Sequence, residues 1–158
     1  MLIPNNEERI SRPEPALNKS GELRLKVFIA DDSIEVKNRL KEMLKENKSI
    51  QLVGESGDAD QALAALRQLK PDVIILDIHM PGGGGMRVLE DSKTRYLGTT
   101  VIIFTVLSYP QYRQAYLSAG ADFFLDKTDG LQKMADVLAE LARAHCMNGN
   151  NEKRGKDR

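Results

Sequence analysis

The chain has one cysteine, no long apolar run and no excess of either charge. Its lone cysteine, Cys146, excludes an internal disulfide and a cysteine zinc cluster, which suits a reducing cytoplasm. Apolar runs such as Val101–Phe104 are far shorter than the ~18 residues of a membrane helix, and Met1–Glu8 lacks the basic and apolar regions of a secretory signal. With 23 basic and 23 acidic residues, no overall field attracts nucleic acid or anionic lipid. We therefore expect a cytoplasmic protein with no membrane partner.

The composition is sufficient for one folded domain between two polar ends. Of the 158 residues, 41% are hydrophobic, which supports a real core and excludes disorder of the whole chain. Residues 1–24 hold three of the six prolines among polar neighbours, so we expect a flexible leader there. Residues 146–158 are likewise polar and are expected to form a flexible tail. The folded domain is predicted over residues 25–145.

Short β-branched runs alternate with segments in which apolar residues recur every three or four positions. Such runs are typical of strands buried on both faces, and the longer period is typical of amphipathic helices. The predicted strands are Leu25–Ala30, Ile50–Glu55, Asp72–Leu76, Thr100–Phe104 and Ala121–Leu125. Asp58 and Asp129, each followed three residues later by glutamine, are expected to cap two of the helices. The alternation predicts an α/β fold with a five-stranded parallel sheet and five helices on both of its faces.

Polar residues follow the predicted strands at the points where the strands end. Asp31 and Asp32 follow the first strand, Asp77 follows the third, Thr105 follows the fourth and Lys127 comes after the fifth. Because the carboxyl ends of parallel strands share one edge of a sheet, and ligands bind at that edge, we expect these side chains to converge.

Each of these residues also has a simpler interpretation. Asp31, Asp32 and Asp77 could cap helices or turns, Thr105 could be an ordinary strand residue, and Lys127 could be solvated. Charge favours a site instead, because two carboxylates ~4 Å apart repel by roughly 4 kcal/mol at an effective dielectric near 20. Three carboxylates together therefore require a cation or a proton, and Mg²⁺ binds such oxygen ligands while it retains water.

These parts suit phosphoryl transfer. Asp77, at the centre of the edge, would attack phosphorus to form an acyl phosphate, while Thr105 and Lys127 bind phosphoryl oxygens. The sequence has no Gly-x-Ser-x-Gly elbow and no Gly-x-x-x-x-Gly-Lys loop. The run Gly82–Gly85 lacks the spacing of a dinucleotide fingerprint and is expected to form a mobile turn over the site.

In this arrangement, and in the pattern Asp77-x-x-Met80-Pro81-x-x-x-Gly85, the chain resembles the receiver domain of bacterial response regulators over about residues 24–145. The resemblance is to single-domain, chemotaxis-type members. It implies a flavodoxin-like fold with strand order 2-1-3-4-5 and phosphorylation of Asp77 by a histidine kinase or histidine phosphotransfer protein.

The resemblance also implies roles for further residues. Mg²⁺ would be held by Asp32, Asp77 and the backbone carbonyl of His79, with Asp31 acting mostly through water. Thr105 and Phe124 would form a switch in which the ring turns inward with the threonine, although Phe124 could equally be a plain core residue. Val106 stands where most members have a small residue, and His79 and Leu107 stand at the positions that tune phosphoryl lifetime. Val106 and Leu107 together predict slow self-hydrolysis.

About a dozen polar residues follow the last predicted helix, too few for a DNA-binding or catalytic output domain. We therefore expect a stand-alone regulator that signals by phosphorylation-dependent protein binding to an unknown target and catalyses only its own phosphorylation and dephosphorylation. A phosphorylation-independent receiver-like adaptor is the alternative. A flavin-binding module is a third interpretation, but Asp31 and Asp32 would repel the flavin phosphate.

Overall fold

The computed structural model of the chain describes residues 16–156, which form an α/β fold. Its strands are β1 (Leu25–Ala30), β2 (Ile50–Ser56), β3 (Val73–Leu76), β4 (Thr100–Thr105) and β5 (Phe123–Asp126). Its helices are α1 (Ile34–Lys45), α2 (Ala59–Leu69), α3 (Gly84–Arg95), α4 (Pro110–Ser118) and α5 (Gly130–Lys156). No helix in this range has both the length and the apolar character needed to cross a bilayer.

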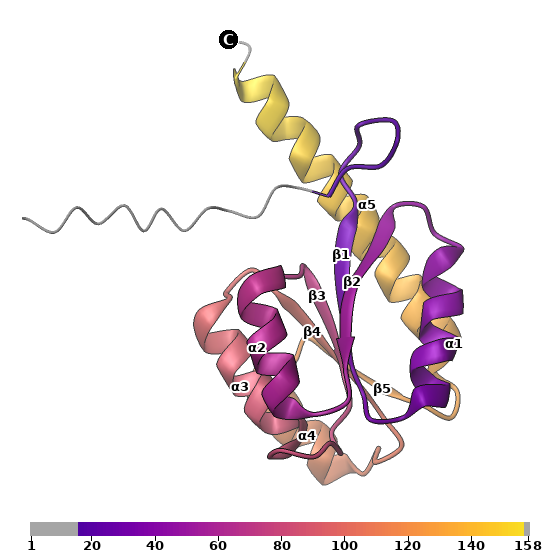
Figure 1. Ribbon diagram of the computed structural model, residues 1–158, viewed down its shortest axis with the longest axis vertical. Coiled ribbons are helices and arrows are strands. Elements are labelled where there is room, and N and C mark those ends of the chain that lie inside the picture. Colours follow the sequence, from indigo (N-terminus) through magenta and orange to yellow (C-terminus); the bar gives the residue numbers. More distant parts are fainter. Residues whose placement is uncertain (1–15, 157–158) are drawn as a thin grey trace, which may run out of the picture.

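The five strands form one parallel sheet in the order β2-β1-β3-β4-β5, which confirms the predicted flavodoxin-like topology. Helices α2, α3 and α4 cover one face of the sheet, and α1 and α5 cover the other (Figure 1). Because β1 is an interior strand covered on both faces, its alternate side chains enter both cores: Phe28 packs with α2 and α3, and Ile29 packs with α1 and α5. All strand ends that carry polar residues therefore meet at one edge.

Local hydrogen bonds fix where the first two helices begin. The hydroxyl oxygen of Ser33 accepts the hydrogen bond from Val36 N and caps α1, while Asp31 Oδ1 accepts one from Ser33 N at 2.8 Å. Asp31 therefore orders the turn before α1 but is not the capping residue. Asp58 Oδ1 accepts a hydrogen bond from Gln61 N at 2.8 Å, which confirms the cap predicted for α2.

Residues 16–24 and 146–156 were predicted to be flexible ends, but the structure gives both segments a defined conformation. The predicted tail, 146–158, is helical as far as Lys156, because α5 continues without interruption. Helix extension costs less than nucleation, and the thiol of Cys146 donates to the carbonyl of Leu23 at 3.1 Å. Residues 16–24 of the predicted leader form a small loop, closed by a bridge between Leu17 and Leu23, that lies beside α5 (Figure 1). The rest of the predicted leader, residues 1–15, lies outside the described residues.

Candidate functional site

Three carboxylates meet at the carboxyl edge of the sheet. Asp31 and Asp32 follow β1 directly, and Asp77 follows β3, where its backbone N–H donates to the carbonyl of Ala30. One carboxylate oxygen from each of the three lies within 4.8 Å of the others. Asp31 and Asp77 are buried, with 2% and 5% of their surface exposed, whereas Asp32 is exposed. The cluster thus has two buried members and opens to solvent through the third.

Lys127 lies between the two buried carboxylates. Its Nζ atom is 2.6 Å from Asp31 Oδ2 and 3.0 Å from Asp77 Oδ2, and only 10% of its side chain is exposed. Its backbone N–H donates to the carbonyl of Thr105 at 2.8 Å, which fixes the lysine at the end of β4. The structure therefore brings Asp31, Asp77 and Lys127 together as the sequence predicts.

Burial and pairing have opposite effects on the pKa of Asp31 and also on the pKa of Lys127. Loss of hydration raises the pKa of Asp31 above its usual value, and the hydrogen bonds from Lys127 and Ser33 only partly oppose this. Burial alone would lower the pKa of Lys127, but its hydrogen bonds to Asp31 and Asp77 outweigh burial and raise it. Lys127 is consequently a firmly charged ammonium group at neutral pH.

Thr105 ends β4 with its side chain fully buried. Its hydroxyl oxygen accepts a hydrogen bond from Leu107 N at 3.1 Å, so the hydroxyl is held by the segment between β4 and α4. Leu107 itself is partly buried against the core, whereas Val106 is 66% exposed. Of the two residues expected to slow hydrolysis, only Val106 thus projects from the surface.

The Phe124 ring already lies inside the protein. It is 6% exposed, and its centroid is 6.5 Å from that of Tyr116 on α4. The guanidinium of Arg113 lies 5.8 Å from the ring centroid, and its Nη1 donates to the Phe124 carbonyl at 3.1 Å. Arg113 was missed by the sequence analysis, because only the tertiary fold brings α4 against β5.

The glycine run after β3 allows a close approach of two backbones. Gly82 and Gly83 have φ values of +85° and +103°, and a Cβ atom on Gly85 would lie 2.4 Å from the carbonyl oxygen of Asp77. The turn was expected to be mobile, yet Arg87 Nη1 donates to the carbonyl of Gly82 at 2.8 Å and to Asp60 Oδ1 at 2.5 Å. These contacts link the turn to α2 through Arg87, and the mobility of the turn stays a prediction.

The donor set fits a hard divalent cation. All three clustered side chains offer carboxylate oxygens, which Mg²⁺ prefers, and the exposed Asp32 gives a bound ion room to keep water ligands. His79, whose backbone carbonyl was expected to be a further ligand, follows Asp77 by two residues, and its N–H approaches Asp77 Oδ1 at 3.4 Å. The arrangement can bind a cation beside a lysine and a buried carboxylate.

Comparison with known proteins supports this interpretation. The response regulator receiver domain family matches residues 27–139. The chain is 33% identical over 119 residues to protein-glutamate methylesterase/protein-glutamine glutaminase 1 of Methanospirillum hungatei, covering 74% of this chain and 35% of that protein. It is 28% identical over 117 residues to response regulator GacA of Pseudomonas aeruginosa, covering 74% of this chain and 55% of that protein. The chain therefore spans between about a third and just over half of the length of these relatives.

Solved structures show the same fold. The response regulator domain of Thermotoga maritima CheB superposes with a TM-score of 0.68 at 27% identity, covering 78% of this chain and 96% of that domain. The isolated REC domain of RcsB from Salmonella enterica serovar Typhimurium superposes with a TM-score of 0.71 at 25% identity, covering 76% of this chain and 89% of that domain. Both matches cover nearly the whole of the compared domain.

Proposed function

Because this chain belongs to the response regulator receiver family of two-component systems, we propose that Asp77 accepts a phosphoryl group from a histidine kinase or a histidine phosphotransfer protein. The observation that carries the proposal is the placement of Lys127 Nζ within 3.0 Å of both Asp31 and Asp77, inside a cluster of three carboxylates. An isolated structural ion pair would not need the third carboxylate at the solvent side. Asp77 is the buried carboxylate at the end of β3, in the middle of the sheet edge.

The proposed reaction conserves charge and atoms in a single displacement. A carboxylate oxygen of Asp77 forms a bond to phosphorus, while the bond from phosphorus to the donor imidazole nitrogen breaks and its electron pair stays on that nitrogen. Lys127 offsets charge on the phosphoryl oxygens, and the hydroxyl of Thr105 donates to one of them. When bound by Asp32, Asp77 and the carbonyl of His79, with Asp31 acting mostly through water, Mg²⁺ supplies further positive charge.

The proposed output is phosphorylation-dependent binding to another protein, whose identity is unknown. Leu107 N, in the segment between β4 and α4, donates to the hydroxyl of Thr105, and Phe124 contacts α4 through Arg113, so a phosphoryl group that engages Thr105 acts on that segment. We propose that this receiver domain acts in the cytoplasm and that its only catalysis is its own phosphorylation and dephosphorylation.

Incubation with acetyl phosphate and MgCl₂, followed by intact-mass spectrometry, tests the proposal. We expect one added phosphoryl group that is lost in Asp77→Asn and after chelation of Mg²⁺. Asp136→Asn removes an exposed carboxylate of α5 outside the cluster and should be modified normally. No modification together with retained partner binding would instead establish the adaptor, and a yellow purified protein would favour the flavin module.

A further inference from the structure

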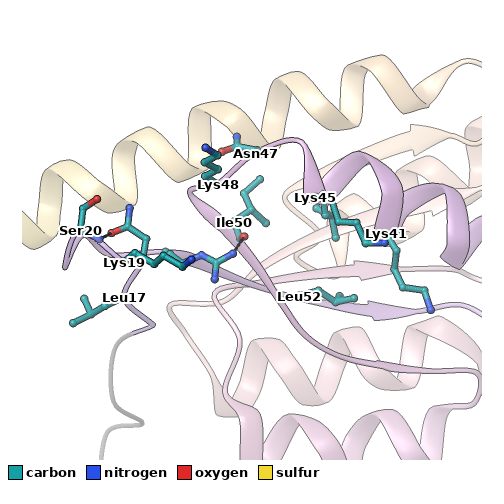
Figure 2. Close-up of a pocket in the computed structure, with 12 residues that line it drawn as sticks. Leu17, Lys19, Ser20, Lys41, Lys45, Asn47, Lys48, Ile50 and Leu52 are labelled. Carbon is teal, nitrogen blue, oxygen red and sulfur yellow. Dashed lines mark hydrogen bonds between the residues drawn. The ribbon is translucent and has the colours of Figure 1, made fainter.

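A cavity lies at the opposite end of the sheet from the acidic cluster. It has a volume of about 620 Å³, which is in the range of ligand sites, and lies at the start of β2. Its walls come from residues 17–24, the last turns of α1 and the turn that leads into β2 (Figure 2). We call it the basic cavity because of the side chains described next.

The basic cavity concentrates positive charge in a chain whose formal net charge is zero. Five of its twelve lining residues are cationic and none is acidic; the cations are Lys19, Arg24, Lys41, Lys45 and Lys48. Glu55 pairs with Lys41 at 2.8 Å, and an exposed Glu42 pairs with Lys45 at 3.1 Å. Within the described part of the chain, the other three cations form no ion pair, so the cavity retains a positive field.

Arg24 has unused hydrogen-bonding capacity. Its Nη2 atom donates to the carbonyl of Ile50 at 2.5 Å, which anchors the guanidinium beside β2. Its Nε–H group is buried and has no acceptor among the described residues. A buried donor without a partner is costly, and a ligand that brought an acceptor to this guanidinium would relieve that cost.

The floor of the basic cavity is apolar, and its cations stand apart. Leu17, Leu44, Ile50 and Leu52 contribute apolar surface, and Leu17 is 50% exposed. Figure 2 shows Lys41 and Lys45 at one end beside α1, Lys19 at the other end, and Ile50 between them. Because apolar side chains separate the cations, one compact anion such as phosphate cannot contact them all. Separated carboxylates with apolar groups between them match this surface better.

We propose that the basic cavity binds an extended acidic segment of a partner protein. Carboxylates of the segment pair with Lys19, Lys48 and Arg24, while its apolar side chains cover Leu17 and Leu52. β2 is an edge strand, so no further strand blocks the approach of such a segment. This docking surface lies away from Asp77 and does not depend on phosphorylation.

Fluorescence anisotropy of the full chain tests the proposal, with a labelled peptide of alternating glutamate and leucine as the probe. Reversing two exposed cations in Lys19→Glu/Lys48→Glu should weaken binding about tenfold or more, because two attractions become repulsions. The control Arg67→Glu/Lys133→Glu makes the same change in net charge on α2 and α5 and should bind like the unmodified chain. Added salt should weaken binding further.

Several outcomes would overturn the proposal. These are equal weakening by both double variants, equal affinity for a peptide of alternating glutamine and leucine, and tighter binding of ATP or of phosphatidylglycerol vesicles than of the acidic peptide. Asp77→Asn should bind the peptide with unchanged affinity. That variant separates the docking surface from the proposed phosphorylation, since either can fail without the other.

Discussion

Replacing Lys127 by methionine tests the charge balance on which the acidic site depends. Methionine has a similar length but no charge, so Asp31 and Asp77 would remain buried without their shared counter-ion. At an effective dielectric near 20, the gross attraction is roughly 6.4 kcal/mol at 2.6 Å and roughly 5.5 kcal/mol at 3.0 Å. Desolvation of the three groups offsets much of this attraction. Loss of one partner of a buried pair therefore leaves a net cost of about 3–5 kcal/mol.

The pH dependence of Lys127→Met follows from the same charges. Burial and the charge of Asp77 raise the pKa of Asp31, and loss of the hydrogen bond from Lys127, which lowers it, raises the pKa of Asp31 further in the folded state. A raised folded-state pKa gives stability that is present at low pH and lost as pH rises. We therefore expect the deficit of Lys127→Met, relative to the unmodified chain, to be largest near pH 8 and to shrink as pH falls toward 4.

Urea unfolding followed by circular dichroism at several pH values measures both effects. Lys133→Met is the matched control, because Lys133 is 64% exposed and lies 3.6 Å from the exposed Asp129. That control should change the free energy of unfolding by less than about 0.5 kcal/mol. A loss below about 1 kcal/mol for Lys127→Met at pH 8, or a deficit that does not shrink at low pH, would refute the reasoning.

Three further changes probe the neighbouring residues. Because burial raises the pKa of Asp31, its ionised form contributes less stability as pH rises, so the free energy of unfolding of Asp31→Asn relative to the unmodified chain should be higher at pH 7 than near pH 3 in urea unfolding. Val106→Ala should shorten the phosphoryl lifetime severalfold by opening access to Asp77, which the decay of a radiolabelled phosphoryl group measures. Leu107→Ala should mainly reduce stability, because Leu107 is partly buried, and thermal melting measures that loss. Gly85→Ala forces a Cβ atom against the Asp77 carbonyl and should destabilise the fold by more than about 2 kcal/mol, which differential scanning calorimetry would detect.

The sheet and its polar edge were predictable because both depend on short-range patterns. Runs such as those at Leu25–Ala30 and Thr100–Phe104 are buried on both faces, so their period and composition identify them without tertiary information. Once the strands are parallel, their carboxyl ends share an edge, which places Asp31, Asp77 and Lys127 together. The general position of the site thus follows from strand ends alone.

Other features depend on contacts between distant elements and leave no local signal. Asp31 and Asp32 were the predicted candidates for capping α1, but the helix begins at Ile34 and Ser33 caps it, while Asp31 pairs with Lys127. The polar composition after Cys146 predicted a tail, but the contact with the loop around Leu23 accompanies a continued helix. Likewise, the position of Arg113 over Phe124 depends on how α4 lies against β5.

The hydrogen bond from Leu107 N to the hydroxyl of Thr105 connects the proposed phosphorylation site to the segment between β4 and α4. A threonine hydroxyl has one donor and two acceptor positions, so Thr105 can donate to a phosphoryl oxygen while it still accepts from Leu107 N. Movement of the hydroxyl toward Asp77 therefore draws the backbone of Leu107 with it. The next residue, Ser108, donates to Asp126 at the end of β5, so the same displacement strains a second contact. Phe124 is already buried, so we expect a partner to detect a change in the segment between β4 and α4, and the joint movement of Thr105 and the ring stays a prediction.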